Sequence, residues 1–516
     1  MFENLLQREQ GRSYTVTERD PRLKEPIARE LRVTLTTLRN ICGSTADLQI
    51  NEMSVSGISL AVVLFEGLAD HQKFSLAAGN LLRDYSALHP TPQKLMEWAK
   101  SELFIAGDKK PFTTYGQLLQ FIMSGFAAVL IDGCAEGLAA GVQGFSFRSV
   151  SEPSSENNLR GSREGFVEAL RINMSMVRRR MKTPALRMEL FQAGKQSNTD
   201  ICLLYRSDLA DAAMLEQVRT RIAQLPLDNI MESGYIRPFL DNGRFSLFSG
   251  VGTTERPDTL CAKLSEGRIA ILVDGTPFAL VLPYLFSENF QSLDDYAQRP
   301  YYATLMRWLK YGAFFLTILL PGTYVATLNF HPELLPDELL FRVAAAEQGM
   351  AFPLMFEALL IHFIYELMRE AGLRLPRPVG HAVSIIGALV IGDAAVTAGL
   401  ISTPMVMVVA LTTISSFVIP SLYEPVTLLR FVFILLGGTL GIFGIVLGLA
   451  VVGVDLCSVT LFGVPATSPE SPVSLYALRD TLVRSSWKKL GRRQFVISRT
   501  AGAPAKEGQN DAETGI

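Results

Sequence analysis

The feature that most constrains this chain is a set of long apolar stretches confined to its C-terminal half. The range 311–330 holds no ionisable side chain except tyrosine, and the ranges 380–423 and 431–463 hold very few. A helix needs about 20 mostly apolar residues to cross the hydrocarbon core of a bilayer. Residues 301–465 are therefore predicted to be an α-helical transmembrane bundle, and nothing before about residue 300 has this pattern.

The membrane region divides into about 4–6 segments. Five apolar runs can be distinguished, at 311–330, 349–368, 380–401, 404–423 and 429–463. Basic residues beside membrane spans stay in the cytosol. Arg307 and Lys310 before the first run, and the basic tail after 478, predict that both ends of the bundle are cytosolic.

Two cytosolic ends require an even number of crossings, so one of the five runs cannot cross once. The run 429–463 is long and rich in glycine, and it could go out and return in part. Alternatively, 380–423 forms a broken, re-entrant pair. The loop after 330 is acidic and suits the outside.

The residues before the membrane region predict an α/β soluble region arranged as two tandem related subdomains. Strand-like runs at 58–65 and 201–205 are each followed by a Leu-Ala-Asp sequence, and apolar runs flank Asp132-Gly133 and Asp274-Gly275. Leu209 follows Leu68 by 141 positions and Asp274 follows Asp132 by 142. Landmarks that recur at nearly one offset indicate an internal repeat, although both are common strand and turn patterns and their match could be a coincidence.

The apolar stretch 121–142 also has the length of a membrane span. Asp132 and Glu136 lie at its centre, and a charge there costs roughly 2.5–3.5 kcal/mol on insertion scales. Asp-Gly between apolar runs is typical of a hairpin turn. We therefore expect a buried β-hairpin.

These patterns divide the chain into six regions: a polar N-terminal segment (1–40), subdomain 1 (41–145), a connecting amphipathic basic helix region (146–194), subdomain 2 (195–300), the transmembrane domain (301–465) and a basic, partly disordered tail (466–516).

Isolated acidic residues inside the apolar runs are the candidates for an ion path, because a charge at membrane depth needs a partner, water or a proton. Glu357 has apolar neighbours on every side, and Asp393 lies among small residues. Glu366 is spaced i, i+4 from His362, and Arg369 continues that face. The alternative is that each acid is structural, held by a hydrogen bond or an internal salt bridge.

The connecting region is predicted to contain an amphipathic helix with a basic end. Its charged residues could couple neighbouring subunits, face solvent or lie on anionic lipid headgroups. The coupling candidates are Arg160, Arg163, Glu164, Arg178, Arg179 and Arg180.

Several classes of function are disfavoured by composition and motif. The formal net charge of −2 gives no reason to expect nucleic acid. The five cysteines form no CxxC pair, which argues against a zinc site and suits a reduced compartment. No phosphate-binding loop or nucleophile elbow occurs, and the histidines are scattered. We therefore expect no enzyme, no cofactor and no metal site, and the polar N-terminus shows no signal-peptide core.

Taken together, these residues resemble the A subunits of the GerA-type spore germination receptors. The resemblance covers about residues 45–470, with a serine at 162 where the family often has proline. It is carried by Ser151-Glu152-Pro153, Arg160 to Phe166, Arg178 to Arg180, Asp228, Ser233 to Ile236, Thr254 to Asp258, Glu266 to Arg268, Asp274 to Pro277, Glu357 to Leu359, Arg369 to Gly372 and Gly387 to Val396.

The resemblance implies an integral protein of the spore inner membrane with a cytosolic N-terminal domain and tail. It implies a nutrient-responsive germination receptor with a transporter-like B subunit and a lipoprotein C subunit. It also implies a homo-oligomeric ring, a pentamer in family models, that forms a cation channel. Three alternatives stay open: a paralogue that accompanies calcium-dipicolinate release, a non-conducting membrane scaffold, and a component of a secondary transporter.

Overall fold

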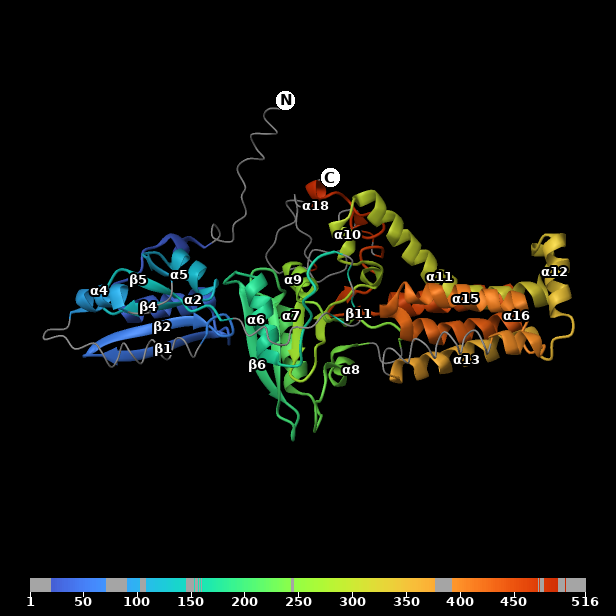
Figure 1. The fold of residues 1–516 in the computed structure, drawn as a ribbon, viewed down its shortest axis with the longest axis horizontal. Coiled ribbons are helices and arrows are strands. Elements are labelled where there is room, and N and C mark those ends of the chain that lie inside the picture. Colours follow the sequence, from blue (N-terminus) through green and yellow to red (C-terminus); the bar gives the residue numbers. More distant parts are fainter. Residues whose placement is uncertain are drawn as a thin grey trace, which may run out of the picture.

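The computed structural model describes residues 20–70, 91–102, 108–144, 153, 156, 158, 160–242, 246–375, 392–471, 473, 478–490 and 497. Two α/β subdomains and a helical region follow one another along the long axis of the molecule (Figure 1). The predicted order of an α/β region followed by helices is therefore confirmed. We call the end of the helical region next to the subdomains proximal, and the opposite end, where α12 lies, distal.

The first subdomain is a five-stranded antiparallel sheet with helices on both faces. Its strand order is β1-β2-β4-β5-β3. Helices α2 and α5 pack on one face and α4 on the other. The elements are η2 (Pro21–Lys24), α2 (Leu31–Cys42), β1 (Leu48–Val55), β2 (Ile58–Phe65), α4 (Pro92–Glu102), β3 (Lys109–Phe112), α5 (Tyr115–Ile122), β4 (Phe126–Ile131) and β5 (Gly137–Gly141).

The second subdomain repeats this arrangement. Its antiparallel sheet has the order β6-β7-β9-β10-β8. Helices α6 and α9 cover one face, and α7 and α8 the other. The elements are α6 (Leu170–Arg180), β6 (Leu186–Ala193), β7 (Thr199–Arg206), α7 (Ala212–Ala223), η3 (Ser233–Tyr235), α8 (Arg237–Leu240), β8 (Gly252–Thr254), α9 (Pro257–Ser265), β9 (Ile269–Val273), β10 (Ala279–Leu282) and η4 (Phe286–Phe290).

The repeat extends to individual hydrogen bonds. Asp132, in the turn between β4 and β5, accepts a hydrogen bond from the backbone N–H of Leu31 at 2.9 Å. Asp274, in the equivalent turn of the second sheet, accepts one from Leu170 at the same distance. Each aspartate thereby binds one of the free N–H groups at the start of a helix. The landmarks that recur along the sequence thus occupy equivalent places in the two sheets.

The segment 121–142 is a buried hairpin, as predicted. β4 and β5 pair antiparallel across the Asp132-Gly133 turn, and all six residues of β4 are buried. Helices on both faces of the sheet explain why this strand is apolar throughout instead of alternating. β6 pairs along its length with β7, so the second sheet begins at Leu186, before the boundary expected at 195.

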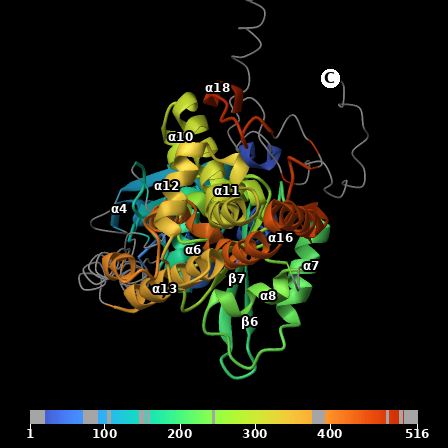
Figure 2. The same cartoon turned by 90° about the vertical axis from the view of Figure 1, so that its right-hand side faces the viewer.

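The helical region contains two helices that are long and apolar enough to cross a membrane, at Pro300–Phe330 and Pro420–Ser458. Figure 2 views the region end-on, with α11, α13 and α16 grouped together. The second subdomain ends with α10 (Asp294–Ala297), and the elements of the helical region are α11 (Pro300–Phe330), η5 (Pro332–Leu334), α12 (Asp337–Glu347), α13 (Leu354–Arg374), α15 (Thr403–Phe417), η6 (Pro420–Leu422) and α16 (Tyr423–Ser458). Part of the apolar run 380–401 lies outside the described residues.

Helix α16 doubles back on itself at Gly441. This glycine has a φ of 65° and a ψ of −148°, which no helix contains. A Cβ placed on Gly448 would lie 2.9 Å from the ring of Phe433, although 15 residues of straight helix would separate the two by about 22 Å. The last apolar run therefore folds back on itself, which is one of the two alternatives that the sequence left open.

After α16 the chain returns to the second subdomain. The hairpin β11 (Thr460–Leu461) and β12 (Val464–Pro465) contributes Leu461, Phe462 and Val464 to the hydrophobic core beneath α7. In the described part of the tail, α18 (Trp487–Leu490) lies beside α10 and the start of α11 (Figure 1).

Candidate functional site

The distal end of the helical region holds a buried carboxylate, Glu357, in the first turn of α13. Its side chain is fully buried, and Oε1 accepts hydrogen bonds from the backbone N–H of Ser402 at 2.6 Å and from the Ser402 hydroxyl at 2.8 Å. The same hydroxyl lies 2.7 Å from Oε1 of Glu347, which also contacts the hydroxyl of Tyr324 at 3.3 Å. Four separate segments therefore meet at this point.

A second polar cluster surrounds Glu366 nearer the proximal end. Its Oε1 lies 3.3 Å from Nη1 of Arg430, its Oε2 lies 3.3 Å from Nη1 of Arg369, and the Tyr423 hydroxyl donates to it. Arg369 also lies over the ring of Tyr423, 3.2 Å from its centroid. Glu366 is therefore held by two arginines and one tyrosine. His362 instead contacts the carbonyl of Ala358 at 2.8 Å.

The three acidic candidates do not form one site. Glu357 and Glu366 are nine residues apart on α13, which corresponds to about 13 Å of helix. Asp393 lies in a short helical segment at 392–397, and its side chain is exposed. The described residues contain no cluster of three or more His, Cys, Asp or Glu arranged to hold a metal ion.

Arg178 lies in the contact between the two subdomains. It is 1% exposed, and its Nε and Nη2 bind both carboxylate oxygens of Asp47 at 2.6 and 2.9 Å. Its guanidinium also lies over the Phe65 ring, 4.8 Å from the centroid, and donates to the carbonyl oxygens of Thr183 and Leu186. Arg178 thus joins α6 to the first sheet within one chain, and in this conformation its side chain does not reach the surface.

The other basic candidates of the connecting region are closer to solvent. Glu164 binds Arg179 and Arg180, each at 2.6 Å, and Ser162 accepts a hydrogen bond from Arg180 at 2.7 Å. Arg163 is exposed and lines a shallow surface pocket with these four residues. Arg160 is also exposed, and its backbone N–H donates to Asp294 at 3.2 Å.

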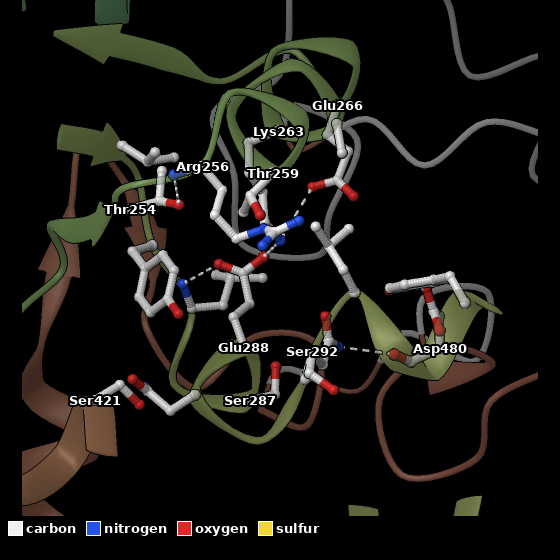
Figure 3. Close-up of a pocket in the computed structure, with 18 of the residues that line it drawn as sticks. Thr254, Arg256, Thr259, Lys263, Glu266, Ser287, Glu288, Ser292, Ser421 and Asp480 are labelled. Carbon is white, nitrogen blue, oxygen red and sulfur yellow. Dashed lines mark hydrogen bonds and ion pairs between the residues drawn. The ribbon is translucent and has the colours of Figure 1, made fainter. Parts of the chain in front are cut away.

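A cavity of about 790 Å³ lies where the second subdomain, the base of α11, η6 and the tail meet. Figure 3 shows Lys263 and Glu266 on one side of it and Ser287 and Ser421 on the other. This volume falls in the range of small-molecule sites. Its lining includes Glu288, which binds Lys263 at 2.6 Å and also Arg268.

Two carboxylates of this cavity have opposite electrostatic environments. Burial alone would raise the pKa of Glu288, but the charges of Arg268 and Lys263 hold that pKa below its ordinary value. Burial raises the pKa of Glu156 to about 7, although the Thr254 hydroxyl donates to it at 2.7 Å. Glu156 can therefore gain or lose a proton near neutral pH, whereas Glu288 stays charged.

The base of α11 is fastened to the subdomain and to the tail by one buried arginine. Arg307 is fully buried, and its Nε binds Asp295 of α10 at 2.8 Å. Its Nη1 binds the carbonyl of Asp480 at 2.6 Å and that of Thr481 at 3.1 Å. Arg307, which the sequence placed as a charge beside the membrane, is therefore an internal anchor.

The end of α16 is fastened in a similar way. Asp455 accepts hydrogen bonds from the Ser246 hydroxyl at 3.0 Å and from the Leu247 N–H at 3.3 Å. Five residues later the β11–β12 hairpin enters the core of the second subdomain, where Arg221 lies over the Phe462 ring, 4.8 Å from its centroid. Both ends of the helical region are thus tied to the same α/β subdomain.

The sequence matches a known protein family over most of its length. Residues 36–496 match the model of the Bacillus/Clostridium GerA spore germination proteins. The chain belongs to the GerA spore germination protein family. The predicted resemblance is confirmed, and with it the expectation that the chain is a spore germination receptor A subunit and not an enzyme.

The relatives of this GerA protein cover nearly its whole length. It is 39% identical over 464 residues to spore germination protein KA of Bacillus subtilis (strain 168), covering 89% of this chain and 85% of the relative. It is 37% identical over 508 residues to the uncharacterized membrane protein YfkQ of the same organism, covering 97% and 98%. The crystal structure of the N-terminal domain of the A subunit of the Bacillus megaterium spore germinant receptor GerK3 matches with a TM-score of 0.40 and 28% identity, over 51% of this chain and 98% of that one.

The structure of this GerA protein adds site residues that sequence reasoning missed. Arg430 is fully buried beside Glu366, although a single arginine at the start of an apolar run resembles a residue at the membrane surface. Glu347 and Ser402 are 10 and 45 residues from Glu357, and no spacing rule connects them. The one available sequence signal was Ser402, two residues before Pro404, because a serine at such a position can cap the start of a helix.

Proposed function

We propose that this GerA protein assembles in the spore inner membrane as a ring of identical subunits, a pentamer, and forms a cation channel that opens in response to nutrient. The ring would act with a transporter-like B subunit and a lipoprotein C subunit. In this proposal, nutrient binding by the partners shifts a closed–open equilibrium of the ring. The exposed Arg160 and Arg163 and the Glu164–Arg179–Arg180 cluster would carry contacts between neighbouring subunits.

The double anchoring of the helical region is the observation that carries this proposal. Arg307 ties the start of α11 to α10 and to the tail, and the β11–β12 hairpin ties the end of α16 into the core of the second subdomain. A movement of that subdomain therefore has to displace both ends of the bundle. Such rigid connections suit a subunit that transmits a signal from soluble domains to membrane helices.

The surface of the helical region supports a membrane position for it. Large apolar side chains are exposed along α11, α13, α15 and α16. Extended exposed apolar patches mark contacts with lipid or with other proteins. They include Phe315, Leu316, Phe356, Phe363, Leu367, Met407, Ile414, Phe417, Phe443, Val446, Val451 and Val454.

The path of the chain is compatible with six crossings. α11 runs from proximal to distal, α13 and α15 run from distal to proximal, and α16 goes out and back around Gly441. Counting the apolar run 380–401, part of which lies outside the described residues, as one further crossing brings the number to six. This topology places the subdomains and the tail in the cytosol and α12 outside.

For the ion path we propose Asp393 and Glu357, the two candidate acids that pair with no arginine among the described residues. Asp393 is exposed in the single subunit, where a ring could bring copies of it together. Glu366 is the weaker candidate because Arg369 and Arg430 already neutralise it.

Current through purified protein in a planar bilayer tests the channel. We expect discrete, cation-selective conductance, and a lower conductance in Asp393→Asn at equal protein abundance. Glu338→Gln is the matched control, because Glu338 is an exposed acid of α12 paired with Arg342. Protein that inserts without carrying current would support a scaffold, and countertransport without discrete conductance would support a transporter component. Either result would contradict the channel.

A further inference from the structure

One hydroxyl proton serves two carboxylates at the distal end of the helical region. The Ser402 hydroxyl oxygen lies 2.7 Å from Oε1 of Glu347 and 2.8 Å from Oε1 of Glu357. Both are hydrogen-bond distances, but a serine hydroxyl carries a single proton. If both acids were ionised, one of these two short contacts would bring two oxygen atoms together without a hydrogen between them.

The other hydrogen-bond donors at this site do not supply the missing hydrogen. The backbone N–H of Ser402 donates to Oε1 of Glu357, and the Tyr324 hydroxyl contacts Oε1 of Glu347. Oε2 of Glu357 is buried and has no hydrogen-bond partner among the described residues. Glu357 itself is fully buried. A buried carboxylate oxygen without a partner carries the full cost of its lost hydration.

No basic side chain of the described chain compensates for these charges. Neither Glu347 nor Glu357 forms an ion pair with a lysine, arginine or histidine within the described ranges. Other titratable groups on these segments are Tyr324 on α11, His362 one and a half turns along α13, and Asp337, Glu338 and Arg342 on α12, while Asp393 is exposed in the segment 392–397. α15 contains no ionisable residue. If both carboxylates are ionised, the pair therefore carries a formal charge of −2 at one shared hydroxyl, and no basic side chain among the described residues balances it.

We propose that Glu347 and Glu357, together with Ser402 and Tyr324, form a binding site for one positive charge, either a shared proton or a small inorganic cation. A proton would supply the missing hydrogen between the carboxylates. A cation such as Na⁺, K⁺ or Ca²⁺ would be bound by carboxylate and hydroxyl oxygens, the ligands that hard cations prefer. The unpartnered Oε2 of Glu357 is the atom that such a ligand would engage.

Occupation of this site would fasten the distal end of the bundle. Its residues come from α11, α12, α13 and the start of α15, and the N–H of Ala351 also donates to the carbonyl of Gly399 at 2.9 Å. With the charge bound, these four segments are held together; without it, the two carboxylates repel each other. The site belongs to the single subunit and holds whether or not an assembly of subunits conducts ions.

Thermal unfolding of the purified full-length protein in nanodiscs tests the site. If a proton is bound, the folded state holds it more tightly than the unfolded chain, so stability falls as pH rises. We then expect the Tm of the parent to drop by several degrees between about pH 5 and about pH 8. If a metal cation is bound, we expect the Tm to rise with NaCl, KCl or CaCl₂ at constant ionic strength.

Glutamine variants connect either response to this pair. Glu347→Gln/Glu357→Gln removes both charges and keeps the side-chain shapes, so we expect most of the pH or cation dependence to disappear. Glu338→Gln on the same helix α12 should retain it, because Glu338 is exposed and paired with Arg342. If the double variant does not fold, Glu347→Gln alone carries the test, since its amide N–H can donate to Glu357.

Infrared spectroscopy distinguishes the two kinds of charge. A protonated carboxyl group gives a C=O band that Glu347→Gln would remove, whereas a carboxylate bound to a cation gives none. The proposal would be overturned if parent and double variant showed the same Tm at every pH and with every cation. Conductance is not measured in these experiments, so failure of this site and failure of the channel proposal remain distinguishable.

Discussion

At the residue scale, the buried arginines among the described residues lie beside a carboxylate or several backbone carbonyls. Arg178, Arg268 and Arg307 are each almost fully buried and each binds a carboxylate. Such pairs add little net stability, because desolvation offsets the attraction, but losing one partner is costly. Their more evident effect is geometric: Arg178 joins the two subdomains and Arg307 joins the helical region to the second.

We expect Arg178→Met to lower the free energy of unfolding by about 3–5 kcal/mol, because it leaves Asp47 as a buried, unpaired charge. Arg179→Met is the matched control on the next residue of α6, where a half-exposed ion pair with Glu164 contributes about 1 kcal/mol or less. The Tm of the full-length protein measures both. The double variant Asp47→Leu/Arg178→Met should recover much of the loss; equal losses in Arg178→Met and Arg179→Met would show that the buried pair does not fasten the subdomains.

At the element scale, the helical region is organised around close contacts between glycines. A Cβ on Gly437 of α16 would lie 2.2 Å from the carbonyl oxygen of Gly322 on α11, and one on Gly322 would lie 2.4 Å from that of Phe433. Small residues allow helix backbones to approach this closely in membrane proteins. The glycines of the last apolar run therefore serve packing as well as the reversal at Gly441.

We predict that Gly437→Ala separates α11 from the first half of α16 and destabilises the bundle by about 1–3 kcal/mol, the usual cost of overpacking. Gly453→Ala and Gly312→Ala are controls on the same two helices, because a Cβ at either position would meet no atom within 4 Å. Thermal unfolding in nanodiscs compares the three variants. A Tm for Gly437→Ala that matches the controls would mean that the close crossing does not form in the membrane.

At the scale of the whole molecule, two copies of one α/β arrangement precede a bundle whose first and last helices both return to the second copy. Among the described residues, the first subdomain is joined to the second by contacts such as Asp47 with Arg178 and Glu66 with Arg171. A signal received by the first subdomain would therefore pass through the second subdomain to reach the membrane helices.

The proposed topology predicts that cysteines at the two ends of the molecule react from opposite sides of the membrane. Phe341→Cys on α12 and Lys195→Cys in the second subdomain are suitable positions, since both side chains are exposed. In a Cys457→Ser background, which removes the exposed native thiol, a membrane-impermeant maleimide added to right-side-out vesicles should label only Phe341→Cys. Labelling of both variants, or of Lys195→Cys alone, would reject the arrangement with α12 outside.

The sequence was most informative where one physical property dominates over a whole segment. β2 and β9 begin and end where their apolar runs do, because both faces of each sheet are covered and every position is selected for burial. The sequence does not predict β1 and β6, because these edge strands consist mostly of half-exposed residues and have no continuous apolar run. Among site residues, Glu357 and Glu366 were recognisable as charges among apolar neighbours, whereas the partners Glu347, Ser402 and Arg430 were not.

By itself, the sequence determined the class of the protein: a duplicated α/β region, an apolar helical region and the family to which they belong. These follow from local composition, periodicity and turn residues, which act over a few neighbouring positions. Only the tertiary structure decided which charges neutralise each other, that Arg178 and Arg307 are internal anchors, and that Glu347 meets Glu357 across Ser402. Contacts between residues tens to hundreds of positions apart depend on how the elements pack, and no local pattern encodes that geometry.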